Sequence, residues 1–402
     1  KSRTASGARQ IAGRLFIPLQ VGLALVLVVL ASCFSQTLNR LRTENTGFDV
    51  DRVTIQTAPF HVLKLDAEAK LVLYQRMVDR LESLPGVASA AVTWFTPMTG
   101  YQATAAFHAL TDKPTAVEDS QMSFNQVGPG YFRTMSTSIL DGRAFERQDR
   151  KRDVCILNQA AAAYFFGREQ AIGRFVTSSD KTAFPEGLGC RVIGVAENAK
   201  FSSLREPPPR TIYFPVTPPV VGTNRNLVFL INAPNKMTAM AAYRTAAREL
   251  APGLPMVGFF TLREQMDAAL GSDRAITLMS NFFSAVALFL SAVGLYGLLS
   301  ASVAQRRAEI GVRMALGARR STVLWMILSD GLRLLAAGGA LGLLGLAASA
   351  RFVEGLLYGV SPFEPLRLAA IAGVLIVVTL VSGLIPASRA CMTDPIRALR
   401  AD

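Results

Sequence analysis

The sequence predicts an α-helical membrane protein with four transmembrane helices plus an extracytoplasmic α+β domain of two subdomains. Half of the 402 residues are apolar and 18% are charged, which is below the roughly 25% of charged residues in soluble domains. The apolar residues gather in four blocks, each long enough to cross about 30 Å of hydrocarbon. One long polar segment, in which strand and helix patterns alternate, separates the first block from the second.

The four apolar blocks are the membrane-span candidates, because each is at least as long as the roughly 17 to 25 uncharged residues that a span needs. The third block is the shortest. Residues on its N-terminal side complete it and bring Asp330 into the span. The predicted transmembrane helices are residues 15–39, 275–304, 323–350 and 368–388.

The position of the charges predicts the orientation. The formal net charge is +13, and the basic surplus lies in segments 1–14, 305–322 and 389–402. Basic segments beside spans stay in the cytoplasm. We therefore expect a cytoplasmic N-terminal segment, connection and tail, and we expect residues 40–274 and the short loop 351–367 outside.

Two other readings are weaker, one of the basic charge of the whole chain and one of the first span. The arginines border apolar spans and form no stripe interleaved with aromatic residues, so we expect no nucleic-acid partner. A cleaved signal peptide could mimic the first span, but the apolar run is too long for one. Because the chain opens on Lys1, we expect it to be a piece of a longer product.

The outer segment 40–274 contains two similar strand–helix–strand patterns, one near each end. They predict a discontinuous α+β subdomain, residues 40–99 and 226–274, into which a β-rich subdomain, residues 100–225, is inserted. In the insert, residues 154–157, 174–177 and 191–195 have strand patterns and residues 159–166 a helical one. A further helix, residues 261–270, is expected to run into the second span.

No residue set predicts catalysis or metal binding. His61 and His108 have no Cys or acidic partner at metal-ligand spacing. The sequence contains no G-x-S-x-G, H-E-x-x-H or G-x-x-x-x-G-K-[ST] motif. We therefore expect no enzyme activity, no metal and no bound cofactor, and an extracytoplasmic enzyme on a membrane anchor is disfavoured.

Cysteines and glycines suggest two structural sites. Cys155 and Cys190 fall in predicted strands of the outer insert, where the compartment allows a disulfide. Small buried cysteines are the other reading, because spacing does not place the Cα atoms. In the third span, Gly338, Gly342 and Gly345 favour close helix packing over phosphate binding.

Charged groups inside the spans are scarce. Asp330 and Arg333 lie one helical turn apart near the inner boundary, where mutual pairing is expected. No other acidic or basic residue occupies the middle of a span. Ion-coupled carriers place such groups near the midplane, so a secondary transporter is disfavoured.

Segment 305–322 is the most informative cytoplasmic stretch. On a helix, Arg306, Glu309, Arg313 and Arg320 form one stripe, and Glu309 and Arg313 have the spacing of a favourable ion pair. The apolar side chains point elsewhere. Such a segment suits either the lipid headgroups or a groove of another protein, and composition slightly favours lipid.

Five runs and the order of the segments are recognisable. The runs are RRAEIGVRMALGA from Arg306, PASRACMTDPIRALR from Pro386, LNQAAAAYFFG from Leu157, IGRF from Ile172, and VIGVAENAKFSSLREPPPRTIYFP from Val192, and the order is span, large outer domain, three spans. In these features the sequence resembles the FtsX-like and MacB-like family of ABC transporter permeases. More narrowly, the chain looks like the C-terminal half of a duplicated orphan permease (ADOP type). The outer segment then corresponds to a MacB-like periplasmic core domain.

The resemblance implies a multi-pass protein of the bacterial inner membrane. The resemblance implies that ATP hydrolysis on a separate cytoplasmic ABC ATPase moves the spans and, through them, the outer domain, a mechanism called mechanotransmission. This movement would serve export or the handling of an envelope substrate. ATP would bind to the partner and not to this chain. The resemblance assigns ATPase coupling to Arg307, Glu309, Ile310, Gly311, Met314, Leu316 and Gly317.

Further partners implied by the resemblance are a second permease half or a homodimer mate, membrane lipid and an envelope protein. The alternative function is a non-transporting membrane scaffold or regulator that controls an envelope enzyme through its outer domain. A substrate-dependent complex with an ATPase would favour the first function, and a stable complex with a hydrolase would favour the second.

Overall fold

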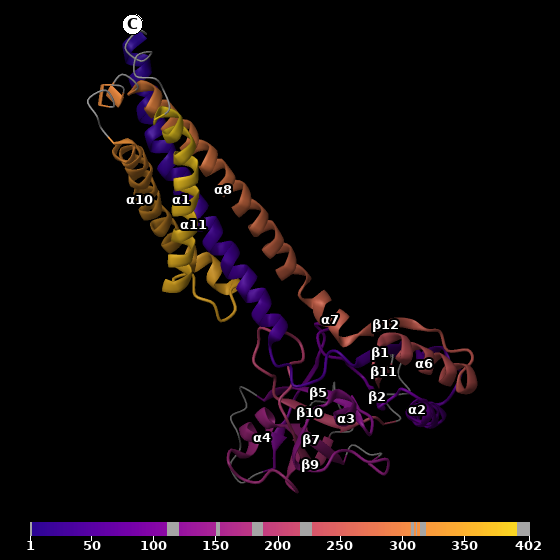
Figure 1. Cartoon of the computed structure of the whole chain (residues 1–402). Coiled ribbons are helices and arrows are strands. Elements are labelled where there is room, and N and C mark those ends of the chain that lie inside the picture. The colour runs from indigo at the N-terminus through magenta and orange to yellow at the C-terminus, as the bar shows by residue number, and fades with distance from the viewer. Residues whose placement is uncertain are drawn as a thin grey trace. The chain divides into compact units, whose positions relative to one another are not determined.

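The computed structural model describes residues 2–110, 120–149, 153–178, 188–217, 227–306, 309–310, 312–313 and 319–391. The chain divides into two compact units. Residues 1–43 and 272–402 form one, called the helical unit below, and residues 44–271 form the other, called the mixed unit. Figure 1 shows the elements of each unit.

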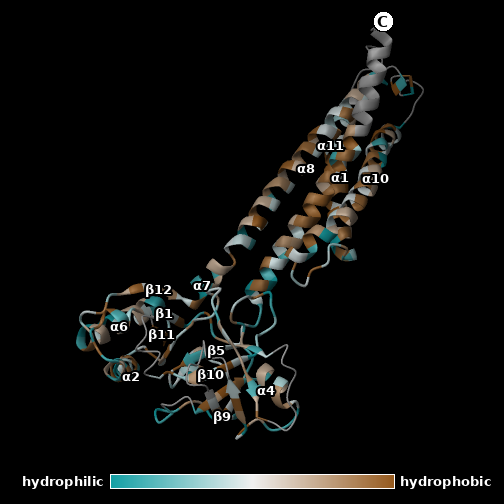
Figure 2. Ribbon diagram, turned by 180° about the vertical axis from the view of Figure 1, so that it is seen from behind, coloured by the Kyte–Doolittle hydropathy of each residue, from teal (hydrophilic) through white to brown (hydrophobic). Residues whose placement is uncertain are grey.

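Four long helices build the helical unit: α1 (Ser2–Thr43), α8 (Gly271–Gln305), α10 (Arg320–Val353) and α11 (Pro365–Cys391). Their apolar parts are long enough to cross a membrane, namely Phe16–Thr43, Gly271–Gln305, Ser321–Leu356 and Pro365–Ser388. Figure 2 shows hydrophobic residues along most of each helix. The helices extend beyond the uncharged blocks. Helix α1, for example, includes Arg40 and Arg42 in its last turn, because long basic side chains can reach the polar membrane surface without ending the helix.

Helices α1 and α8 are joined by hydroxyl groups at seven-residue intervals. Thr277 donates a hydrogen bond to the carbonyl of Phe34 (3.3 Å), Ser284 to that of Leu27 (2.7 Å) and Ser291 to that of Gln20 (3.5 Å). A step of seven residues is about two helical turns and returns to the same face. Small hydroxyl side chains allow helices to approach closely and satisfy their own polar groups in the membrane. We call this contact the hydroxyl seam.

Helices α1 and α10 approach through glycines. A Cβ atom on Gly342 would lie 2.8 Å from the carbonyl oxygen of Gly22, and one on Gly338 would lie 2.8 Å from that of Pro18. A Cβ on Gly345 would be in ordinary contact with Val26, at 3.4 Å. Gly338 and Gly342 therefore allow the close approach of α1 and α10, whereas the position of Gly345 has room for a small side chain.

Polar groups tie α1 to the first turn of α11, which follows the 3₁₀ turn Glu354–Leu356. The side chain of Arg367 is 8% exposed. It donates hydrogen bonds to Cys33 Sγ (3.0 Å), Gln36 Oε1 and Glu364 Oε2 (2.6 Å). A buried guanidinium needs such partners. The predicted loop 351–367 is thus partly helical and pinned to α1.

The mixed unit contains a sheet of twelve strands among the described residues, in the order β12-β1-β11-β2-β5-β10-β7-β9-β8-β4, with β3 beside β5 and β6 beside β9. The strands are β1 (Val53–Ala58), β2 (Ser89–Thr93), β3 (Ala103–Ala106), β4 (His108–Ala109), β5 (Gln121–Val127), β6 (Ile139–Gly142), β7 (Val154–Asn158), β8 (Phe175–Ser178), β9 (Leu188–Ala196), β10 (Thr211–Pro215), β11 (Leu227–Asn232) and β12 (Val257–Thr261). The helices are α2 (Ala67–Ser83), α3 (Tyr131–Met135), α4 (Gln159–Phe166), α6 (Lys236–Leu250) and α7 (Leu262–Ala269), with a 3₁₀ turn at Phe60–Val62.

One hydrophobic core lies between α2, α6 and strands β1, β2 and β11. Tyr243 and Phe229 are fully buried at its centre, with ring centroids 5.6 Å apart. The side chains of Asp66 and Asn235 cap the two helices by accepting hydrogen bonds from backbone N–H groups. These caps explain why α2 and α6 begin where they do.

A second hydrophobic core is built from residues between Ala105 and Phe214. Phe107, Phe124 and Phe214 pack together, with ring centroids 6.0 to 6.3 Å apart. Strands β5 and β10 run parallel through it. The two cores share one sheet, because β2 pairs with β5 at Thr93 and Val127.

The expected helix 261–270 is separate from the helix that follows it. Helix α7 begins with a capping box formed by Thr261 and Glu264 and ends at Ala269, and α8 begins at Gly271. Leu270 between them is not helical. The expected continuous helix is therefore interrupted at one residue.

The ion pair between Arg143 and Asp149 should stabilise the mixed unit at neutral pH. Arg143 Nη1 lies 2.6 Å from Asp149 Oδ2, and the carboxylate is only 8% exposed. The hydrogen bond from Arg143 lowers the pKa of Asp149. A depressed pKa means that the stabilisation is present above the pKa of the unfolded chain and is lost as the pH falls through the folded one.

We therefore expect Asp149→Asn to reduce the free energy of unfolding at pH 7 by about 1 kcal/mol, a figure that allows for the partly exposed guanidinium. The loss should begin to shrink below pH about 4, where the carboxyl of the unfolded chain takes up a proton, and should disappear as the pH falls through the lower pKa of the folded carboxyl. Thermal unfolding of the purified chain at several pH values measures it. Glu169→Gln, which removes the exposed partner of Arg174, is the control and should change little. Equal losses at pH 7 and pH 3 would contradict the assignment.

Candidate functional site

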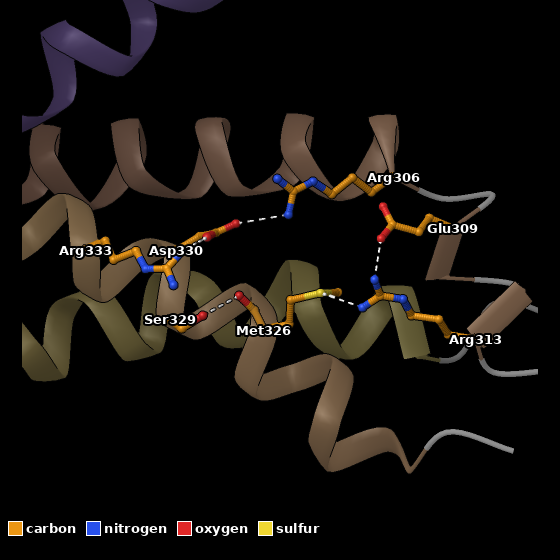
Figure 3. Close-up of polar contacts among 7 residues, drawn as sticks. All are labelled: Arg306, Glu309, Arg313, Met326, Ser329, Asp330 and Arg333. Carbon is orange, nitrogen blue, oxygen red and sulfur yellow. Dashed lines mark hydrogen bonds and ion pairs between the residues drawn. The ribbon is translucent and has the colours of Figure 1, made fainter.

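The predicted coupling segment lies where α8 ends and α10 begins. Figure 3 shows the polar contacts among its described residues. Of the residues that the resemblance assigns to coupling, Glu309 and Ile310 lie within the described part of the chain. The others lie outside it, namely Arg307, Gly311, Met314, Leu316 and Gly317.

Glu309 and Arg313 form an ion pair on the exposed side of the segment. Arg313 Nη2 donates to Glu309 Oε1 at 2.6 Å, and both side chains are 51% exposed. This is the four-residue spacing predicted for a helix. Arg313 also reaches Met326 Sδ of α10, at 3.2 Å, so the pair is connected to the bundle.

Ile310 differs from the expectation that it would be an exposed apolar side chain. It is 4% exposed and packs with Leu299, Val323, Ile327 and Ala387 of the three neighbouring helices. Burying a side chain of this size contributes about 1.5 to 3 kcal/mol. Ile310 therefore anchors the segment to the helical unit, while the side chains of Glu309 and Arg313 stay half exposed.

A charged trio lies beside the anchor. Arg306, in the turn after α8, lies 3.3 Å from Asp330, and Arg333 lies 3.5 Å from the other oxygen of the same carboxylate (Figure 3). The predicted pairing of Asp330 with Arg333 is present, and Arg306 is an additional partner. Both distances exceed the 2.7 to 2.9 Å of strong charge-assisted hydrogen bonds.

A pocket of about 400 Å³ opens next to this trio. Its walls come from the last two turns of α8 and from α10, and it is lined by Leu298, Leu299, Ala301, Ser302, Gln305, Arg306, Asp330, Arg333 and Leu334. A smaller cavity on the other side of Asp330 reaches Ile310. Arg306 and Asp330 thus lie between the pocket and the anchor of the coupling segment.

The structure also places the other predicted site residues. Cys155 and Cys190 are joined by a disulfide, with Cα atoms 5.7 Å apart, and both are fully buried in the second core. Gly338, Gly342 and Gly345 all face α1. Among the described residues, no three His, Cys, Asp or Glu side chains gather in a way that could hold a metal ion.

Sequence reasoning missed two polar features of the helical unit. The seven-residue spacing of Thr277, Ser284 and Ser291 is visible in the sequence and could have predicted the hydroxyl seam. Arg367 was assigned to an outer loop, and no local signal indicates that it is buried against Cys33 of a helix more than 300 positions away.

Two family profiles match the chain. The MacB-like periplasmic core domain matches residues 19–250, and the FtsX-like permease C-terminal domain matches residues 281–395. Together they include most of the mixed unit, the coupling segment and the hydroxyl seam except Thr277.

Similar curated proteins include the macrolide export ATP-binding/permease protein MacB of Bartonella quintana, 26% identical over 291 residues, and that of Rhodopseudomonas palustris strain HaA2, 28% identical over 298 residues. Each alignment covers 69% of this chain, and 42% and 43% of the relative. The chain therefore spans less than half the length of these relatives.

Among solved structures, the periplasmic region of MacB from Actinobacillus actinomycetemcomitans aligns with 56% of this chain and 96% of its own, at 14% identity and a TM-score of 0.35. The family assignment comes from the sequence profiles, one of which covers more than half of the 402 residues. The chain belongs to the MacB-like and FtsX-like family of ABC transporter permeases, as a multi-pass inner-membrane protein with a large extracytoplasmic domain.

Proposed function

We propose that this chain is the permease part of a mechanotransmission transporter. ATP hydrolysis on a separate cytoplasmic ABC ATPase would move the four helices, and the helices would move the extracytoplasmic domain to export or handle an envelope substrate. The observation that carries the proposal is the two-sided coupling segment: Ile310 is buried among the helices, and the ion pair of Glu309 with Arg313 is exposed.

A two-sided segment suits force transfer. Movement of a bound partner would act on the exposed charged pair, and the buried anchor would pass the displacement to α8 and α10. ATP would be bound by the partner, since this sequence contains no P-loop motif. The curated relatives are named as ATP-binding and permease proteins in one chain, which supports an ATPase as the partner of this permease.

We also propose that two permease halves work together, in one polypeptide or as a homodimer. The support is the outer face of α8, where Leu278, Phe282 and Phe289 are largely exposed. Cross-linking of single cysteines at Phe282 in native membranes tests this pairing. Cross-links between chains would support a homodimer.

Charge reversal tests the coupling segment. The expected result is that Glu309→Arg abolishes co-purification of an ABC ATPase with the tagged chain from its native membrane. The double variant Glu309→Arg with Arg313→Glu restores an ion pair inside the chain but presents reversed charges to a partner. If the partner reads these charges, the double variant should also lose the ATPase, by about tenfold or more.

The control is the same pair of variants measured for thermal stability. Full recovery of ATPase binding in the double variant would show that only the stability of the segment matters and would contradict recognition of the charges. Capture of an envelope hydrolase with no ATPase, in wild type and variants alike, would favour the scaffold or regulator function.

A further inference from the structure

The pocket between α8 and α10 has a polar end and an apolar end. Arg306, Asp330 and Arg333 form the polar end, and Leu298, Leu299 and Leu334 belong to the apolar wall. Its volume of about 400 Å³ lies in the range of ligand sites, which is roughly 300 to 1,000 Å³. This size suits a headgroup and the beginning of an acyl chain.

The charges at the polar end do not balance. Two guanidinium groups and one carboxylate carry a net charge of +1. A guanidinium has five N–H donors and a carboxylate has two oxygens, so donors remain after both arginines have paired with Asp330. The side chain of Arg333 is 81% exposed and is open to a further anion.

The pocket lies at headgroup depth. Helix α8 has 35 residues, a length of about 52 Å, against a hydrocarbon thickness of about 30 Å. It begins on the extracytoplasmic side, so Arg306, in the turn after its last residue, reaches the cytoplasmic headgroups. Leu298 lies eight residues earlier, about 12 Å deeper. The polar end of the pocket therefore lies at the depth of the lipid headgroups, and its apolar end lies at the depth of the acyl chains of the inner leaflet.

We propose that this pocket binds an anionic glycerophospholipid of the cytoplasmic leaflet. The phosphate lies between Arg306 and Arg333, and the first part of an acyl chain lies along Leu298 and Leu334. The apolar wall selects a lipid over free phosphate, because inorganic phosphate gains nothing from leucine side chains. This inference goes beyond the proposed function, since it requires neither an ATPase nor a transported substrate.

Lipid retention tests the proposal. The full chain is purified in mild detergent, incubated with equal amounts of phosphatidylglycerol and phosphatidylcholine, and analysed by native mass spectrometry. Wild type should retain phosphatidylglycerol in preference. Arg306→Gln with Arg333→Gln should bind it about tenfold or more weakly, because each arginine near the membrane surface contributes up to roughly a factor of five.

The matched control is Arg274→Gln with Arg351→Gln. It removes the same amount of charge near the first turn of α8 and the last turn of α10, away from the pocket. Asp330→Asn should act in the other direction and strengthen retention by about threefold, because it removes the competing anion. Circular dichroism and size-exclusion chromatography establish that each variant is folded.

Three results would overturn the proposal. One is equal loss of phosphatidylglycerol in the pocket variants and the control variants. Another is displacement of the lipid by inorganic phosphate at about 50 mM, close to physiological ionic strength, when chloride at the same ionic strength displaces none. That result would show a phosphate site without lipid selectivity. The last is a changed oligomeric state of the pocket variants with unchanged lipid retention, which would assign the pocket to a second copy of the chain.

Discussion

Gly342→Val is expected to open the helical unit. Its Cβ atom would lie 2.8 Å from the carbonyl oxygen and 3.1 Å from the Cα atom of Gly22. Both are backbone atoms, so α1 and α10 must move apart. Overpacking of this kind costs about 1 to 3 kcal/mol, and separation of α1 from α10 also exposes the glycine contact at Gly338.

Cys33 provides the readout, because its thiol is free and fully buried against α11 and the α10–α11 connection. In a Cys391→Ser background, Gly342→Val should raise the rate of maleimide labelling of Cys33 by about tenfold or more, since 1.4 kcal/mol corresponds to a factor of ten. Gly339→Val is the matched control. A Cβ at Gly339 meets nothing within 4 Å, so its labelling rate should equal that of the parent. Equal rates in the two valine variants would show that the close approach at Gly342 is unimportant.

Loss of the disulfide is expected to have a comparably large effect on the mixed unit. Cys155 and Cys190 are 35 positions apart. A closed loop of this length stabilises the folded state by about 4 kcal/mol in the chain-entropy description. Replacing both cysteines by alanine should lower the melting temperature of the mixed unit by about 10 °C, as measured by calorimetry of the full chain in detergent.

Reduction of the wild-type chain supplies the control. Dithiothreitol should lower its melting temperature by a similar amount and should leave the double alanine variant unchanged. Cys33→Ala, which alters the helical unit only, should keep the sensitivity to reduction. A wild-type transition that does not respond to the reductant would mean that the bridge adds no stability.

The long helices were predictable because a membrane leaves a strong compositional signal. Their ends were less so. The absence of charge placed the first span at 15–39, but α1 covers Ser2–Thr43. The helix continues to a depth where Arg40 and Arg42 can reach the polar membrane surface. The length of the uncharged stretch reflects only the thickness of the hydrocarbon layer, so it does not predict this extension.

Strand β5 escaped prediction because some of its buried residues are polar. Strand β5 contains Asn125 and Gln126, which are almost fully buried. The side chain of Asn125 donates to Thr93 and to the carbonyl of Phe95, so its burial depends on partners from a distant part of the chain. The sequence alternates from Gln121 to Asn125, but this pattern predicts one exposed face, whereas Ser123 and Asn125 are buried as well.

The candidate site was predictable in its local part only. The four-residue spacing predicted the pair of Glu309 with Arg313, which the structure contains. The burial of Ile310 depends on three helices that meet around it. A helical projection of the segment cannot predict this burial, because it shows the direction of each side chain around the helix axis but not which other helices lie in that direction.

The hydroxyl seam restricts how α1 and α8 can move past one another. The polypeptide enters the mixed unit from α1 and leaves it into α8. Donors at every seventh residue face acceptors at every seventh residue, so a small slip of one helix along the other breaks all these bonds together. Restoring them needs a slip of two full turns, about 10.5 Å. The hydroxyl seam therefore favours one fixed register between the two helices that flank the mixed unit in the sequence.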